Sequence, residues 1–134
     1  MGIVSEYMCD RTPGTRHAIL IDPADQTPDI AANRALAAAH AGSSMILVGG
    51  SSDTDTENVH ATIVAIKEAL ELVTWAASQD SDAAGGSGEI PVVLFPQGAT
   101  ALSPAADGIT FMVLMNSMDQ RFLIGEQVKG APFV

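Results

Sequence analysis

The chain of 134 residues is long enough for one small domain, and its 47% of hydrophobic residues argue against disorder. Sixteen acidic residues against six basic ones give a net charge of −10, so we expect no nucleic-acid partner. The single cysteine, Cys9, excludes an internal disulfide. Because the apolar stretches are too short to span a membrane and no signal-peptide pattern stands at the start, we expect a cytoplasmic protein without an integral membrane segment.

Four apolar runs of strand length follow one another along the chain. None of them alternates between polar and apolar residues, which is typical of strands that are buried on both faces. A proline at the entry of the third run is tolerable there. The sequence therefore predicts strands near residues 17–22, 45–49, 91–95 and 109–115.

Helical patterns separate these runs. The first predicted helix begins at Thr27, which offers an N-cap before Pro28, and it stops at Gly42. The second helix carries apolar residues at steps of three and four on one face: Val59, Ile63, Ile66, Leu70 and Val73. We expect a polar loop over residues 79–88, a short helical stretch near residues 103–106, and a last helix that starts after Asn116 and Ser117.

Strands that alternate with helices predict an α/β fold built from parallel β/α units. Two arrangements of the parallel sheet are compatible with this pattern, a flavodoxin-like open sheet and a closed barrel, and composition alone does not distinguish between them. A whole (β/α)8 barrel takes about 200–250 residues and eight strands. The chain has half of that.

Polar groups stand where the predicted strands end, which is where parallel α/β folds place their functional groups. Asp22 follows the first strand, Gly49, Gly50 and Ser51 close the second, and Asn116 and Ser117 follow the fourth. Each has a plain structural interpretation: an Asx turn at Asp22, a tight glycine turn, and a helix cap at Asn116-Ser117. Together, a carboxylate, a hydroxyl and free backbone amides make an all-oxygen corner that suits Mg²⁺ and a phosphate.

Five short blocks stand in order over residues 17–127. They read ILIDP at 19–23, VGGS at 48–51, PVVLFP at 91–96, LSPAADGITFMVLMNS at 102–117 and FLIGEQ at 122–127. In order and spacing these blocks resemble the geranylgeranylglyceryl phosphate synthases, the Mg²⁺-dependent prenyltransferases of ether-lipid synthesis. The Asn-Ser ending of the fourth block resembles the branch that contains the monofunctional archaeal and bacterial enzymes.

The resemblance implies the amino-terminal half of a (β/α)8 TIM-type barrel, with strands 1 to 4 in residues 1–134. It implies an enzyme that joins geranylgeranyl diphosphate to sn-glycerol 1-phosphate with Mg²⁺ as cofactor. The metal ligands carry over to Asp22 and Ser51, and the substrate-binding positions to Gly49, Gly50 and Asn116. Two departures from the family pattern are Ala24-Asp25 in place of a DK pair and an inserted Gln97.

The family's glycerol-phosphate site and general base lie in second-half segments such as YLE(A/Y)GSG and GGGI, which this sequence does not contain. We therefore expect no catalytic residue in residues 1–134 and no activity of this chain alone. The alternatives are a non-catalytic half-barrel that self-associates or binds a partner half, and an unrelated phosphate-binding barrel or flavodoxin-like domain. Because a half-barrel leaves its sheet edges bare, we expect a homo-oligomer.

Overall fold

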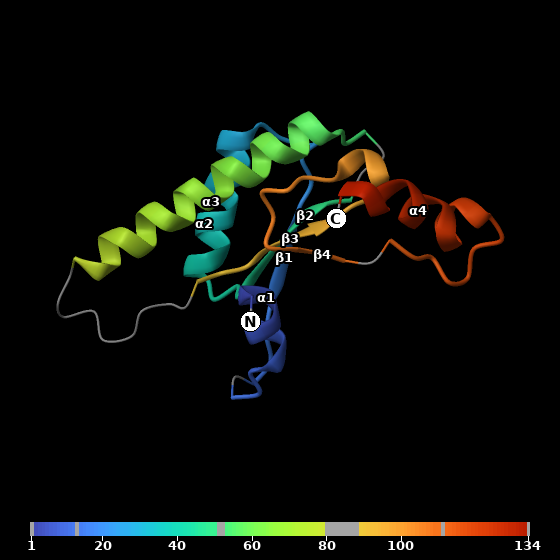
Figure 1. Ribbon diagram of the computed structural model, residues 1–134. Coiled ribbons are helices and arrows are strands. Elements are labelled where there is room, and N and C mark those ends of the chain that lie inside the picture. Colours follow the sequence, from blue (N-terminus) through green and yellow to red (C-terminus); the bar gives the residue numbers. More distant parts are fainter. Residues whose placement is uncertain (1, 13, 51–52, 80–88, 111, 134) are drawn as a thin grey trace.

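The computed structural model describes residues 2–12, 14–50, 53–79, 89–110 and 112–133 (Figure 1). Its centre is one parallel sheet in the order β1-β2-β3-β4. The strands are β1 (Ala18–Ile21), β2 (Met45–Gly49), β3 (Val92–Phe95) and β4 (Gly108–Ile109). A strand order without reversal is expected of half a barrel, whereas a doubly wound sheet reverses its order at a switch point. The predicted half-barrel arrangement is confirmed.

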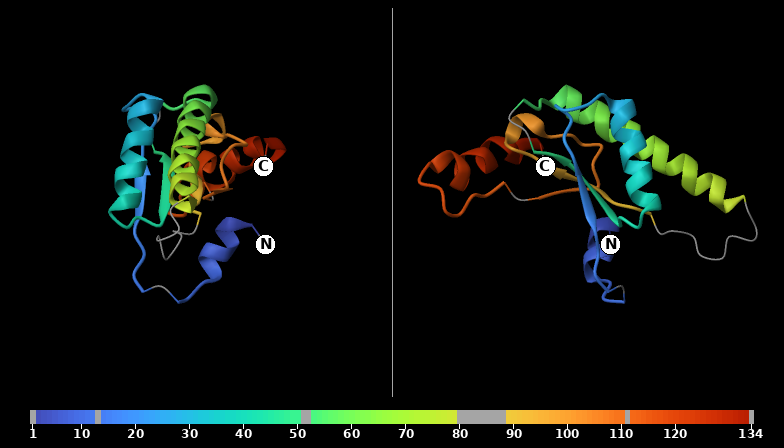
Figure 2. Two further views of the ribbon diagram at one scale, coloured as in Figure 1. Left: turned by 90° about the vertical axis from the view of Figure 1, so that its left-hand side faces the viewer. Right: turned by 180° about the vertical axis from the view of Figure 1, so that it is seen from behind.

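Helices α2 (Pro28–His40) and α3 (Thr56–Ser78) pack side by side over one face of the sheet, as the two further views show (Figure 2). Their small and branched residues meet alternate strand residues, because every second side chain of a strand points to the same face. The centre of this core is fully buried. It includes Ala31, Ala35, Ile46, Val48, Val59, Ile63, Ile66 and Val92.

The helix boundaries follow the predicted signals. Pro28 stands in the first turn of α2, although the Thr27 side chain makes no capping hydrogen bond. Gly42 ends the helix with a φ of +99°. Helix α3 begins with a reciprocal cap: Asp55 Oδ1 accepts the N–H of Asn58 at 2.8 Å, and Asn58 Oδ1 accepts the N–H of Asp55 at 3.1 Å.

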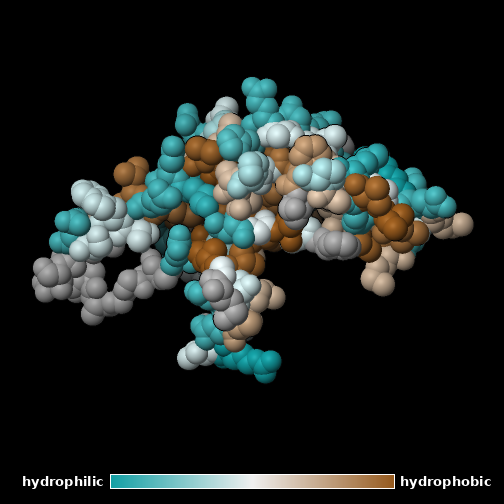
Figure 3. Space-filling view, in the orientation of Figure 1, coloured by the Kyte–Doolittle hydropathy of each residue, from teal (hydrophilic) through white to brown (hydrophobic). Residues whose placement is uncertain are grey.

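The opposite face of the sheet is open near the carboxyl ends of β1 and β3, whereas Val93 in the middle of β3 is buried on that face. Leu20 and Phe95 point away from α2 and α3 and are 49% and 44% exposed. Beyond β4, residues 112–133 carry further exposed apolar side chains, which gather at one end of the molecule (Figure 3). They are Leu114, Met115, Met118, Leu123, Ile124, Val128 and Phe133. An apolar surface of this kind marks a contact face.

The fourth strand is shorter than predicted. It was expected over residues 109–115, but β4 covers only Gly108–Ile109. The Thr110 N–H still donates to Leu94 O at 2.9 Å, and Phe111 lies outside the described residues. The ladder ends here, and further along the chain the Leu114 N–H donates to Phe122 O at 2.9 Å instead of to a strand.

The short helices also depart from the prediction. A 3₁₀ turn, η1 (Ala99–Ala101), precedes the expected stretch at residues 103–106. The last helical region starts later than expected and consists of η2 (Arg121–Gly125), α4 (Glu126–Gly130) and η3 (Ala131–Phe133).

At the other terminus, α1 (Ile3–Cys9) was not predicted. It lies at the start of the strands, where Val4 contacts Gly108 and the Tyr7 hydroxyl is 3.0 Å from Ser44 Oγ. The predicted loop falls mostly on residues 80–88, outside the described part. None of the described helices is long and apolar enough to cross a membrane.

Candidate functional site

Asp22 and Gly50 lie together where β1 and β2 end. A Cβ added to Gly50 would be 3.3 Å from Asp22 Oδ2, so the carboxylate lies directly against the glycine backbone. The other oxygen, Oδ1, accepts the N–H of Ala24 at 3.0 Å. The Asx-turn interpretation of Asp22 is therefore correct, and the turn aims Oδ2 toward the end of β2. The second predicted metal ligand, Ser51, lies outside the described residues.

The glycine pair that closes β2 is required by the backbone itself. Gly49 and Gly50 have φ values of +137° and +125°, a region that L-residues with a Cβ avoid. A Cβ on Gly49 would also lie 2.1 Å from the carbonyl oxygen of Phe95, at the end of β3. The tight-turn interpretation thus holds for both residues, and their role in substrate binding stays a prediction.

Helix α3 does not begin at this glycine turn. It starts at Thr56, and Asp55 already accepts an N–H of its first turn, that of Asn58. A phosphate at the end of β2 would therefore be met by turn amides rather than by the amides of the helix.

The structure places Asn116 in an exposed turn well beyond β4. The turn is closed by the Ser117 N–H, which donates to Leu114 O at 2.9 Å, and no helix begins there. The helix-cap interpretation is therefore wrong. Ser117 Oγ accepts instead the N–H of Asp119 at 3.0 Å. Within the described part of the chain, no contact joins Asn116 to the Asp22–Gly50 corner.

Sequence reasoning missed Glu126, a carboxylate at the start of α4 that is only 3% exposed. It accepts the N–H of Ala99 at 2.8 Å, the Nε–H of Arg121 at 2.7 Å and the ammonium of Lys129 at 3.3 Å. The Ala99 N–H and the Arg121 guanidinium lower the pKa of Glu126 from 4.5 to about 2, against the effect of burial. The sequence did contain a signal for Glu126: it is an acidic residue in an apolar segment, with Arg121 five positions before it and Lys129 three positions after it.

This carboxylate makes the stability of the fold pH-dependent. The lowered pKa means that Glu126 stabilises the folded chain above pH 4.5, and that this contribution is lost as the pH falls toward about 2. We expect Glu126→Gln to lower the free energy of unfolding at neutral pH by roughly 2 kcal/mol, as for hydrogen bonds to a charged group. Urea unfolding at several pH values should show this difference shrinking across that window. A difference that stays constant across the window would contradict the assignment.

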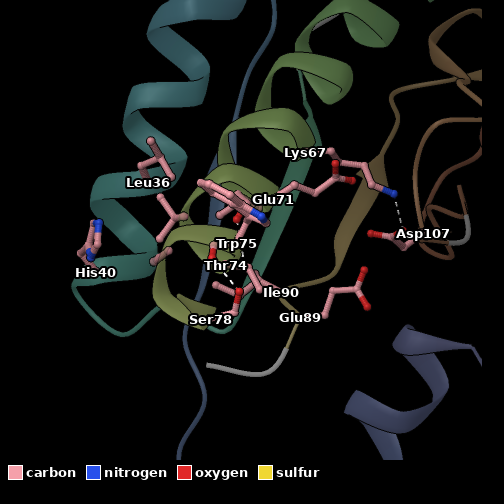
Figure 4. A pocket seen from close by; sticks show the side chains of 13 residues that line it. Leu36, His40, Lys67, Glu71, Thr74, Trp75, Ser78, Glu89, Ile90 and Asp107 are labelled. Carbon is pink, nitrogen blue, oxygen red and sulfur yellow. Dashed lines mark hydrogen bonds and ion pairs between the residues drawn. The ribbon is translucent and has the colours of Figure 1, made fainter. Parts of the chain in front are cut away.

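A cavity of about 710 Å³ lies at the opposite end of the strands from Asp22. It is bounded by α2, by the second half of α3, and by the segments that enter β3 and β4 at Ile90 and Asp107 (Figure 4). At its rim Asp107 accepts a hydrogen bond from Lys67 at 2.6 Å and another from the N–H of Val92 at 2.8 Å. These bonds hold β4 in register with β3, so both carboxylate oxygens of Asp107 have structural roles.

Among the described residues, no three His, Cys, Asp or Glu side chains gather to hold a metal ion. The donors at the Asp22–Gly50 corner are one carboxylate oxygen and backbone groups. Such a sparse oxygen set fits Mg²⁺, which keeps several waters and takes further ligands from substrate phosphates. It does not fit a transition metal held by imidazole or thiolate groups.

Comparison with known proteins agrees with this fold. The model of the PcrB family matches residues 86–134. The geranylgeranylglyceryl phosphate synthase of Methanococcoides burtonii is 38% identical over 133 residues, which are 98% of this chain and 47% of that protein. That of Thermofilum pendens is 37% identical over 135 residues, covering 99% of this chain and 46% of its own length.

Two solved structures are similar along almost the entire chain. Wild-type GGGPS from Thermoplasma volcanium matches with a TM-score of 0.79 and 36% identity, covering 99% of this chain and 46% of its own. The synthase of Thermoplasma acidophilum, solved in complex with its substrate sn-glycerol-1-phosphate, has a TM-score of 0.77 and 32% identity. The chain is thus similar to geranylgeranylglyceryl phosphate synthases along nearly its whole length, and it spans about half the length of the relatives it matches.

Proposed function

We propose that residues 1–134 form the diphosphate-binding half of a Mg²⁺-dependent prenyltransferase, one that joins geranylgeranyl diphosphate to sn-glycerol 1-phosphate in the cytoplasm. The observation that carries the proposal is the position of the Asp22 carboxylate, which lies against the Gly50 backbone at the shared end of β1 and β2. The names of the similar proteins support the reaction. The bound sn-glycerol-1-phosphate of the Thermoplasma acidophilum enzyme supports the acceptor.

The proposal gives each group a distinct task. Asp22 and Ser51 would hold the cation, and the turn amides at Gly49 and Gly50 would approach the phosphate oxygens. When bound, Mg²⁺ would neutralise charge on the leaving diphosphate. The Asx turn at Asp22 fixes the side chain before any ligand arrives, which reduces the ordering cost of binding. By the family resemblance, the groups that hold glycerol phosphate and take its proton lie outside these residues.

An Asp22→Asn variant tests the proposal. Asparagine keeps an oxygen that can accept the Ala24 N–H, so the turn and the fold should persist while the negative charge is lost. We expect the affinity of the chain for inorganic pyrophosphate in the presence of Mg²⁺ to fall by at least about 10-fold, the smallest loss usual for residues that serve a metal. Isothermal titration calorimetry measures it.

The matched control is Asp25→Asn, which removes the same charge from an exposed carboxylate three residues away. We expect this variant to bind Mg²⁺-pyrophosphate like the unmodified chain. If both variants lose affinity equally, the effect is one of overall charge. If Asp22→Asn retains full affinity, Asp22 is not part of the metal site and the proposed function loses its main support.

A further inference from the structure

The turn that follows β3 is held from two sides. On one side, Thr56 Oγ1 at the start of α3 donates to Thr100 O at 3.0 Å. On the other side, the Ala99 N–H donates to the buried carboxylate of Glu126 at 2.8 Å. Of these two bonds, only the second has an ionised acceptor, the carboxylate of Glu126, which is buried. Hydrogen bonds to charged groups are shorter and about twice as strong as neutral ones.

Gly98 makes room for this carboxylate. A Cβ at position 98 would lie 2.7 Å from Glu126 Oε2, closer than a Cβ carbon approaches another heavy atom. The φ of Gly98 is 179°, which any residue can adopt, so the glycine is not needed for its backbone conformation. Its lack of a side chain serves the approach of Glu126 to the turn.

The same turn borders the candidate site. β3 ends at Phe95, which is in register with Gly49 at the end of β2. The two backbones are so close that a Cβ on Gly49 would be 2.1 Å from Phe95 O and 3.4 Å from Pro96 N. A shift of residues 96–99 would therefore press on Gly49, and Gly50 beside it contacts the Asp22 carboxylate.

We propose that Glu126 is a positioning residue for the Asp22–Gly50 corner: its carboxylate fixes the turn at residues 96–99, and that turn fixes the end of β2. The inference rests on the proposed function for its effect on binding. The mechanical link between Glu126 and the end of β2 is argued from the contacts alone. The low pKa of Glu126 supports it, because the carboxylate stays ionised at every pH at which the enzyme would work.

The test compares Glu126→Gln with a matched control, Asp107→Asn. Both residues are little-exposed carboxylates that pair with a lysine and accept one backbone N–H, but Asp107 lies at the opposite end of the strands. A glutamine side chain at position 126 would offer one acceptor oxygen and a donor amide in place of two acceptors, so either the bond from Ala99 or both bonds from Arg121 and Lys129 must fail. Each variant is first checked by urea unfolding, and a milder Arg121→Gln variant serves if Glu126→Gln does not fold.

Two readouts separate positioning from stability. In ¹⁵N–¹H spectra we expect the amide signals of Gly49 and Gly50 to move in Glu126→Gln and to stay in place in Asp107→Asn. The affinity for pyrophosphate with Mg²⁺ should fall roughly 10-fold in the first variant alone, as for outer residues that orient a metal site. Arg121→Gln should show the same changes at smaller size, since two donors to Glu126 remain.

The outcomes keep the two proposals apart. Unmoved Gly49 and Gly50 signals in a folded Glu126→Gln chain would overturn the positioning role, whatever the affinity. Moved signals with full affinity would equally overturn it, because the corner would then tolerate the shift. If the unmodified chain binds no Mg²⁺-pyrophosphate but the signals move as expected, the proposed function fails and the mechanical link between Glu126 and the end of β2 stands.

Discussion

A Gly49→Ala substitution is expected to lower the free energy of unfolding by roughly 3 kcal/mol or more, one of the large single-residue effects. Two costs combine at this position. The φ of +137° is unfavourable for any residue with a Cβ, and the new methyl group would lie 2.1 Å from Phe95 O. The overlap involves backbone on both sides, so no side chain can turn away to relieve it. The register between β2 and β3 must open instead.

Gly42→Ala is the matched control, because it separates these two costs. Gly42 also has a positive φ, +99°, but a Cβ there would meet nothing within 4 Å. Alanine at this position should cost only about 1–2 kcal/mol of left-handed strain. Urea unfolding of both variants gives the comparison. Equal losses would show that backbone strain alone decides, and that the contact of Gly49 with Phe95 does not limit the fold.

The local pattern of the first three strands was sufficient to predict them. Each is an apolar run that ends at a proline or glycine signal, and each pairs with a neighbouring strand of the sheet. The fourth run has the same composition, yet only Gly108–Ile109 form a strand. After Thr110 the backbone leaves β3, and at Leu114 its N–H donates to Phe122 O instead of to a strand. The apolar pattern of the run does not show this competing contact.

Part of the candidate site could likewise be predicted from the sequence, and part could not. The meeting of Asp22 and Gly50 follows from topology, since parallel neighbouring strands end at one edge. Glu126 could not be placed by that argument. Its main partner, Ala99, is 27 residues away, and the bond forms only after the turn following β3 has folded against α4. Asn116 was singled out by its place after the fourth predicted strand and by the resemblance, and the structure gives it an exposed turn beyond the shortened β4, closed by the bond from the Ser117 N–H to Leu114 O.

The chain by itself is expected to catalyse no prenyl transfer. Residues 1–134 supply the corner proposed for diphosphate but not the groups proposed for the acceptor and its proton, and they span about half the length of their relatives. Orienting both reactants can supply about 7–11 kcal/mol of a barrier, and half a site orients only one. The purified chain is incubated with Mg²⁺, geranylgeranyl diphosphate and sn-glycerol 1-phosphate, and ether product is measured by chromatography.

Adding a second half-barrel in trans should restore turnover, because the surface that would receive it is present. The open part of the sheet face carries Leu20 and Phe95, and the segment beyond β4 carries Met115 and Met118 at 87% and 101% exposure. The probe is the carboxyl-terminal half of the Methanococcoides burtonii relative, and a matched control uses the chain with Met118→Asp. This change puts a charge on the exposed apolar segment, away from the Asp22–Gly50 corner, so it should weaken complementation while Mg²⁺-pyrophosphate binding persists.

The same experiment decides between a partner half and a second copy of the chain. Two copies would each bring a net charge of −10, so their association should need salt to screen the repulsion, whereas a less acidic half would not. Sedimentation of the chain alone at low and high KCl tests whether two copies of the chain associate. Robust turnover by the chain alone, with a dimer in solution, would show that two copies rebuild the site and would end the half-enzyme interpretation. Turnover that appears only with the second half, and that is reduced with Met118→Asp, would support it, because the exposed apolar surface would then be where the enzyme is completed.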